Sequence, residues 1–293
     1  MPREPFLAPS RARGVVTTLK RLFVIFASAC VAPCFLVSTA LAGEFEFESS
    51  GGTYFQYYLT QDNRYSDMPP GYRFAFNIEN QFYRTAYGHW FINVADATVI
   101  SRQDTAVIKL DKIRYRIDPG FRFTEHRYEG NVLLSHECIH QIDRERFGGS
   151  IFWNSLQGNL GTKGAYDRNL VARVVERDFS LRNSLDYKVG ADAYLFGPAN
   201  AFIAQNHDYR ARAQTLLRYN WALWEKSAFY VDLRNDAWAT KHGEIQWRGS
   251  AQLNWILLSR KSVGILFAEH TYIDQNPFEN ENSLWSLGVR VLY

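Results

Sequence analysis

The stretch Leu133–Asp143 concentrates the residue types that could carry chemistry. Two histidines, a glutamate and a cysteine fall within five consecutive positions. As a helix, this stretch contains the zinc-hydrolase pattern H-E-x-x-H, in which the two imidazoles lie one turn apart and the glutamate is the base. As a β-strand, it places His136, Cys138 and His140 in one row on one face. The secondary structure therefore decides which chemistry is open to these residues.

Strict alternation of apolar and polar residues predicts strands on both sides of this stretch. The segments Leu185–Leu195, Tyr209–Leu223 and Ile245–Trp255 each exceed the usual strand length of about 5–6 residues. Long alternating runs separated by turn residues are typical of outer-membrane β-barrels. The last run ends on the aromatic residue Tyr293, which resembles the C-terminal signal read by the outer-membrane assembly machinery. We therefore expect this machinery to be a partner and the central stretch to be a strand.

The predicted fold is an all-β antiparallel transmembrane barrel of about 12 strands, within a range of about 10–14. Thirteen segments alternate, 168–178 among them, and the pattern through Asp118-Pro119-Gly120 fits either one long strand or a hairpin. Single-chain bacterial barrels have even strand numbers, so one segment is misassigned. Long loops belong outside the cell and short turns in the periplasm, and these two assignments conflict between residues 150 and 200. The error is expected there.

Residues 1–42 have the order of a secretory signal peptide. A basic region precedes the apolar run Leu22–Val31, and Ala40-Leu41-Ala42 forms a small-x-small cleavage site. We expect export to the outer membrane of a Gram-negative bacterium and a barrel over residues 43–293. Cys138 is then the only cysteine of the mature chain and cannot form an internal disulfide. The net charge of +3 is too small to predict nucleic acid as a partner.

The predicted inner face of the barrel is rich in arginine with interspersed acids. One interpretation is a charged core that holds a narrow barrel together, and the alternative is an anion-selective pore. The arginines are Arg73, Arg114, Arg116, Arg173, Arg210, Arg212, Arg218, Arg234, Arg248 and Arg290, and the acids are Glu79, Asp186, Asp192, Asp232 and Asp236.

On the central strand, the row His136, Cys138 and His140 shares its face with apolar residues and is expected to face lipid. The opposite face carries serine, glutamate, glutamine and aspartate and belongs in the lumen. On the next strand Asn154 shares a face with Phe152, so it is expected to join the histidines on the outer wall. Polar groups facing lipid cost free energy. Function is a natural reason to keep them, and acyl chains are then the natural substrate.

This arrangement resembles outer-membrane phospholipase A, in which a strand-borne His-x-Ser is followed across a hairpin by Trp-Asn. Trp153-Asn154 matches the second half. For the first half, His140 has the family-like spacing to Asn154 but Ile142 replaces the serine; alternatively, His136-Glu137-Cys138 supplies His-x-nucleophile with cysteine for serine. Lipid A deacylase barrels also use His-x-Ser. The resemblance implies acyl transfer. The phospholipase family also uses calcium, which enters here by family resemblance alone, because the family's calcium residues have no match in this sequence.

The catalytic candidates are His136, Cys138, His140 and Asn154. In the expected mechanism, His136 takes the proton of Cys138 and Asn154 orients a histidine. The residues themselves predict no cofactor and no metal. The alternative is a non-catalytic barrel, either a small channel or a degenerate phospholipase relative. Membrane lipids and a second copy of the chain, as a homodimer, are the expected partners.

Overall fold

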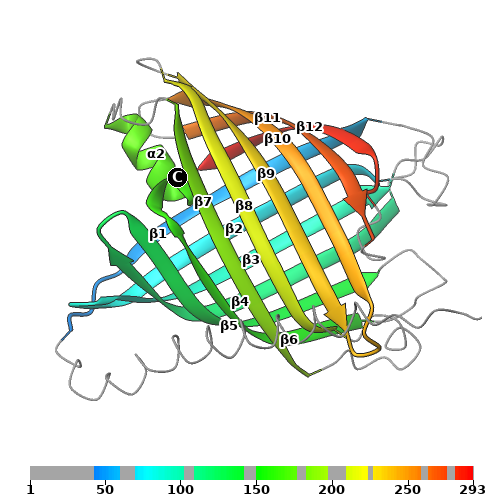
Figure 1. Ribbon diagram of the computed structural model, residues 1–293, viewed down its shortest axis with the longest axis horizontal. Coiled ribbons are helices and arrows are strands. Elements are labelled where there is room, and N and C mark those ends of the chain that lie inside the picture. The colour runs from blue at the N-terminus through cyan, green and yellow to red at the C-terminus, as the bar shows by residue number, and fades with distance from the viewer. Residues whose placement is uncertain are drawn as a thin grey trace, which may run out of the picture. The chain divides into compact units, whose positions relative to one another are not determined.

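Twelve antiparallel strands close into a barrel in which each strand pairs with its neighbours in sequence and β1 pairs with β12 (Figure 1). This computed structural model describes residues 43–59, 70–101, 109–141, 150–176, 183–196, 209–223, 227–258, 263–275 and 281–292. The proposed signal peptide, the external loops other than 241–244, and Tyr293 lie largely or wholly outside the described residues. Among the described residues, no helix has the length and apolar character needed to span a bilayer.

The strands are longer than those of most globular proteins, as the alternating runs predicted. Their bounds are β1 Glu48–Leu59, β2 Pro70–Thr85, β3 Gly88–Ser101, β4 Lys109–Glu125, β5 Tyr128–Gln141, β6 Ser150–Thr162, β7 Ser184–Phe196, β8 Tyr209–Leu223, β9 Ser227–Thr240, β10 Ile245–Leu258, β11 Val263–Asp274 and β12 Leu284–Leu292. The stretch through Asp118-Pro119-Gly120 is one continuous strand, β4.

The outer wall is a belt of exposed apolar side chains. Phe74 is 49% exposed, Leu134 54% and Leu287 48%, and their neighbours along each strand point into the lumen. A closed barrel has no free sheet edge, so the backbone groups inside the belt pair between neighbouring strands. An apolar belt around a barrel without edges is the arrangement that a bilayer requires. The chain is an antiparallel transmembrane β-barrel.

The misassigned segment is the helix α2, Asp167–Val175, which the sequence pattern presented as a strand over 168–178. It follows a short 3-10 turn, Lys163–Ala165, in the connection between β6 and β7. With this segment removed from the strand count, the connections 60–69, 102–108, 142–149, 197–208, 241–244 and 275–283 all fall at one end. That end is the extracellular one by loop length, and the conflict between residues 150 and 200 disappears.

The prediction that Arg210 faces the lumen was wrong. Arg210 is exposed, whereas Tyr209, which was expected outside, is 3% exposed and points inward. The register between β8 and β9 shifts between Tyr209 and Ala211. Such a bulge adds one residue to one strand and reverses the faces beyond it. Arg173 lies in α2, and its side chain is outside the described set.

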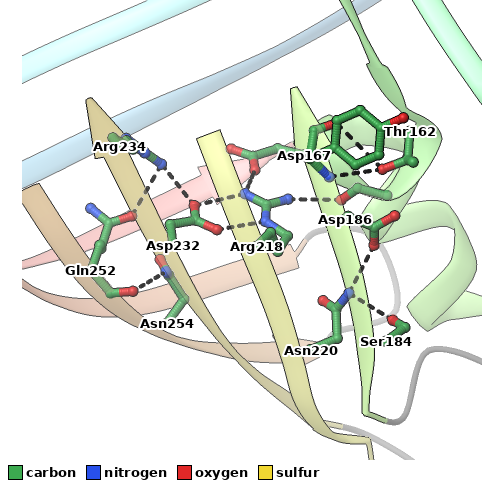
Figure 2. A network of polar contacts seen from close by, with 12 residues as sticks. Thr162, Asp167, Ser184, Asp186, Arg218, Asn220, Asp232, Arg234, Gln252 and Asn254 are labelled. Atoms are coloured by element: carbon green, nitrogen blue, oxygen red, sulfur yellow. Dashed lines mark hydrogen bonds and ion pairs between the residues drawn. The ribbon is translucent and has the colours of Figure 1, made fainter. Parts of the chain in front are cut away.

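Many of the described charges of the lumen are joined into ion pairs, several of them across neighbouring strands. Arg218 is 1% exposed and binds the carboxylate of Asp232 through Nε and Nη2, at 2.7 and 2.8 Å (Figure 2). Arg212 and Asp192 form a second pair at 2.5 Å. A buried pair of this kind holds its two strands in one register, because separating it leaves an uncompensated charge. The described charges therefore fit the interpretation of a barrel held together from within.

Candidate functional site

The outer-wall site lies on β5 and β6, near their extracellular ends. The central stretch is a strand, so the H-E-x-x-H interpretation fails: residues four apart on a strand lie about 13 Å apart rather than one helical turn. The register pairs His136 with Asn154 and Cys138 with Phe152. His136 is exposed on the outer wall, and Cys138, His140 and Asn154 are half-buried beside it. All four predicted residues therefore share the lipid-facing surface.

His136 is oriented by Asn154. Its Nδ1 lies 2.9 Å from the amide oxygen of Asn154. Because this oxygen can only accept a hydrogen bond, Nδ1 carries the proton and Nε2 is the basic nitrogen. The ring of Phe152 lies 6.1 Å from the imidazole at an interplanar angle of 30°. The imidazole is thus held in one tautomer with its basic nitrogen free to act.

Cys138 contacts the other imidazole. Its Sγ lies 3.1 Å from Nε2 of His140, which is within hydrogen-bond distance for sulfur. The ring of Tyr115 on β4 meets the His140 ring edge-on at 5.7 Å. Tyr115 is paired with Cys138 across β4 and β5, so one aromatic side chain stands beside both members of the thiol–imidazole pair. The sequence did not single out Tyr115, because only the register between the two strands brings it there.

The hydrogen-bond contacts therefore form two pairs, Cys138 with His140 and His136 with Asn154. From the sequence, His136 was expected to take the proton of Cys138. These two residues share a face and stand two positions apart, which is about 6.6 Å along a strand. His140 is also two positions from Cys138, and in the described contacts its imidazole is the one within hydrogen-bond distance of the thiol. The four predicted residues are together, but in a different combination from the expected one.

The lumenal side of the same strands is firmly packed. Ile139, Ile151 and Trp153 alternate with the site residues and are at most 5% exposed, in a cluster with Tyr209 and Trp238. Beside Cys138, Glu137 points inward and pairs with Arg114 at 3.0 Å. A site whose supporting strands are packed and cross-linked from behind keeps its side chains in place, which catalysis requires.

Calcium does not fit the residues described at this site. Calcium takes 6–8 oxygen ligands, whereas the groups around Cys138 are two imidazoles, a thiol and one amide oxygen that already accepts from His136. Within the described ranges, no group of three histidine, cysteine, aspartate or glutamate side chains could hold a metal ion. The described side chains of this site therefore offer no calcium ligand set.

Comparisons with known proteins found similarity to solved structures of outer-membrane barrels. No protein-family model matches the sequence, and no curated protein sequence matches it. The solved structures with a similar fold include the outer membrane phospholipase OMPLA of Salmonella typhi, a dimer with bound calcium, at TM-score 0.49 and 8% identity, covering 85% of this chain and 92% of that one. The outer membrane phospholipase A of Escherichia coli (TM-score 0.48, 8% identity, 85% and 91%) and the KdgM porin (0.44, 8%, 83% and 98%) are also similar. At these identities the likeness concerns the fold alone.

Proposed function

We propose that this barrel hydrolyses acyl esters of membrane lipids at its outer wall, with Cys138 as the nucleophile and His140 as its base. The observation that carries the proposal is the thiol–imidazole contact of 3.1 Å on a surface that faces lipid. A thiol beside an imidazole is the arrangement from which a thiolate nucleophile forms. The lipid-facing position supplies ester substrates without their having to leave the bilayer.

The first half-reaction forms a thioester. His140 takes the thiol proton at Nε2 while the sulfur bonds to the ester carbonyl carbon, giving a tetrahedral intermediate. The intermediate collapses with cleavage of the bond to the alcohol oxygen, and a histidine returns a proton to that oxygen. His140 performs this second task with the proton that it took from the thiol. His136, whose Nδ1–H is held by Asn154 and whose Nε2 is basic, is suited to deprotonating the water of the second half-reaction.

The second half-reaction releases the fatty acid. A water molecule, deprotonated by His136, attacks the thioester carbonyl and the thiolate leaves to recover the proton. An alcohol in place of water gives acyl transfer rather than hydrolysis by the same steps. The proposed partners are membrane lipids and, by the same lipid-facing wall, a second copy of the chain.

The test is fatty-acid release by the purified barrel in detergent, with phospholipid and with lipopolysaccharide as substrates. We expect release with at least one substrate, and its loss in Cys138→Ala. The matched control is His270→Ala, because His270 lies on another part of the outer wall, stacked on Trp285 at 4.4 Å. Assays with calcium and with a chelator determine whether the reaction uses the metal that the resemblance implies. Full activity in Cys138→Ala, or no release from either lipid, would reject the proposal.

A second candidate function, passage of small solutes, is favoured by one observation. The lumen contains a cavity of about 1100 Å³, lined by side chains of all twelve strands and rich in arginine. Single-channel recording in a planar bilayer tests this function independently of lipid chemistry. Conductance in a Cys138→Ala barrel, with no fatty-acid release by the unmodified chain, would make the pore the function of the protein.

A further inference from the structure

The connection between β6 and β7 is exceptional among the turns at its end of the barrel. The other connections there, 86–87, 126–127, 224–226 and 259–262, have two to four residues, whereas this one spans 163–183. Short turns are the rule at the periplasmic end. The additional length forms the 3-10 turn and α2, which Figure 1 shows at one end of the barrel. The position and length of this connection therefore need a physical explanation.

This segment is fixed to the inside of the barrel by its charges. Asp167 accepts a hydrogen bond from Arg218 at 2.7 Å and pairs through its other oxygen with Arg290 on β12 (Figure 2 draws the Arg218 contact). Arg218 also donates from Nη1 to the carbonyl oxygen of Gly164, at 3.1 Å. On the opposite side, Arg168 and Asn169 bind the buried carboxylate of Glu129 on β5, at 2.9 and 2.7 Å.

The segment is also fixed by apolar packing. Leu170 is 2% exposed within a lumenal cluster of residues from β9, β10 and β11, and Ala165 is 3% exposed. The cluster consists of Ala228, Tyr230, Ile256, Val263 and Ile265. Gly164 leaves no room for a side chain, because a Cβ there would lie 2.1 Å from a carboxylate oxygen of Asp186 on β7.

Taken together, these contacts reach across the mouth of the lumen. Arg168 lies 3.7 Å from Glu79 on β2, while Asp167 binds β8 and β12, and Leu170 packs on the strands between them. In a closed twelve-stranded barrel, β2 and β8 stand on opposite walls. A segment bound to both walls covers the opening between them. Tyr166, Asp167 and Arg168 line one boundary of the large lumenal cavity, which continues from there toward Trp153 and Trp238 at the other end.

We propose that Lys163–Val175 is a plug that closes the periplasmic mouth of the lumen, and that the barrel conducts ions when this plug is released. The inference concerns the lumen and does not depend on the chemistry at Cys138. The central contact is the carboxylate of Asp167 between Arg218 and Arg290, because it joins the plug to two well-separated strands. Neutralising it removes the charge that both guanidinium groups share, and Arg218 keeps its pairing with Asp232 on the wall.

The experiment is planar-bilayer recording of the full chain in potassium chloride at near-physiological ionic strength. We expect no conductance steps from the unmodified barrel, and steps at least tenfold above the baseline from Asp167→Asn and from Leu170→Ser. The matched control is Asp192→Asn, which removes a buried carboxylate that binds only wall residues, Arg212 and Gln214, in the described contacts. This control is expected to stay closed.

Two further variants keep the test decisive. Replacement of 164–176 by a short glycine-serine turn must open the lumen even if a point variant fails to fold, and folding is checked by the mobility shift of the barrel on boiling. In the second variant, Gly164→Cys and Asp186→Cys are added to Asp167→Asn, and the native cysteines are replaced by alanine. A disulfide between positions 164 and 186 must then hold the plug in place and keep the pore closed until a reductant is added. Equal conductance by the unmodified chain and the variants, or by Asp192→Asn, would overturn the proposal. So would a folded deletion variant that stays closed.

Discussion

Replacing His140 by alanine tests the proposed chemistry most directly, because the thiol of Cys138 contacts that imidazole at 3.1 Å. Without a base, an ordinary thiol with a pKa of about 8.5 is roughly 3% thiolate at pH 7. A thiol that passes its proton to a neighbouring imidazole reacts as if fully ionised. The loss of the base therefore costs about thirtyfold in kcat/KM at pH 7, or about 2 kcal/mol.

The total loss is expected to be larger than this factor alone. The imidazolium formed in the first step also returns its proton to the leaving alcohol, and general acid–base catalysis contributes about 10²–10⁴-fold. We therefore expect His140→Ala to lose between about a hundredfold and ten-thousandfold in kcat/KM at pH 7. His270→Ala, a histidine of the outer wall stacked on an indole, is expected to stay within about twofold of the unmodified chain, since it lies on β11.

The pH profile separates a base from a structural residue. In His140→Ala the reactive thiolate must come from solvent titration, so kcat/KM should rise about tenfold per pH unit until the thiol pKa is passed. The unmodified chain should level off at lower pH, because its thiol passes the proton to the neighbouring base rather than to solvent. Fatty-acid release measured between pH 6 and pH 9.5 gives both curves. Parallel curves for the two proteins, or a loss below about threefold at pH 7, would refute the assignment of His140 as the base.

Three further predictions rest on single contacts. Asn154→Ala should lower kcat about five- to tenfold, because it removes the hydrogen bond that fixes the tautomer of His136. A rise in KM with kcat unchanged would indicate a role in substrate binding instead. Arg218→Leu should lower the free energy of unfolding by up to about 3–5 kcal/mol in urea titration, because it removes the two-pronged partner of the buried Asp232 carboxylate and leaves it only Arg234. Arg84→Leu, which breaks an exposed pair, should cost less than about 1 kcal/mol. Burial raises the pKa of Asp167, but the guanidinium groups of Arg290 and Arg218 outweigh burial and hold that pKa below its ordinary value. The plug should therefore stay bound from pH 7 down to about pH 5 and loosen only as the pH falls below the ordinary aspartate pKa of about 3.9. Conductance that appears at pH 5 would contradict this contact.

The sequence could predict most of the barrel because alternation is a local property. Each side chain on a strand points to the face opposite its neighbour. The apolar residues of β2, β7 and β12 therefore predict which face meets lipid, even before the neighbouring strands are known. The two errors arise where alternation is ambiguous or broken. A nine-residue segment such as Asp167–Val175 fits a strand or a helix about equally, and the bulge beside Tyr209 has no signal in the residue types.

By itself, the sequence determined that His136, Cys138, His140 and Asn154 share the lipid-facing wall. Every second side chain on a strand points to the same side, and these residues alternate with the lumenal ones. It could not determine which imidazole meets the thiol, because that depends on side-chain rotamers and on Tyr115 arriving from β4. It also could not show that the β6–β7 connection folds back into the lumen. That outcome depends on Asp167 meeting Arg218 and Arg290, which lie 51 and 123 residues further along the chain, and only the closed barrel brings them together.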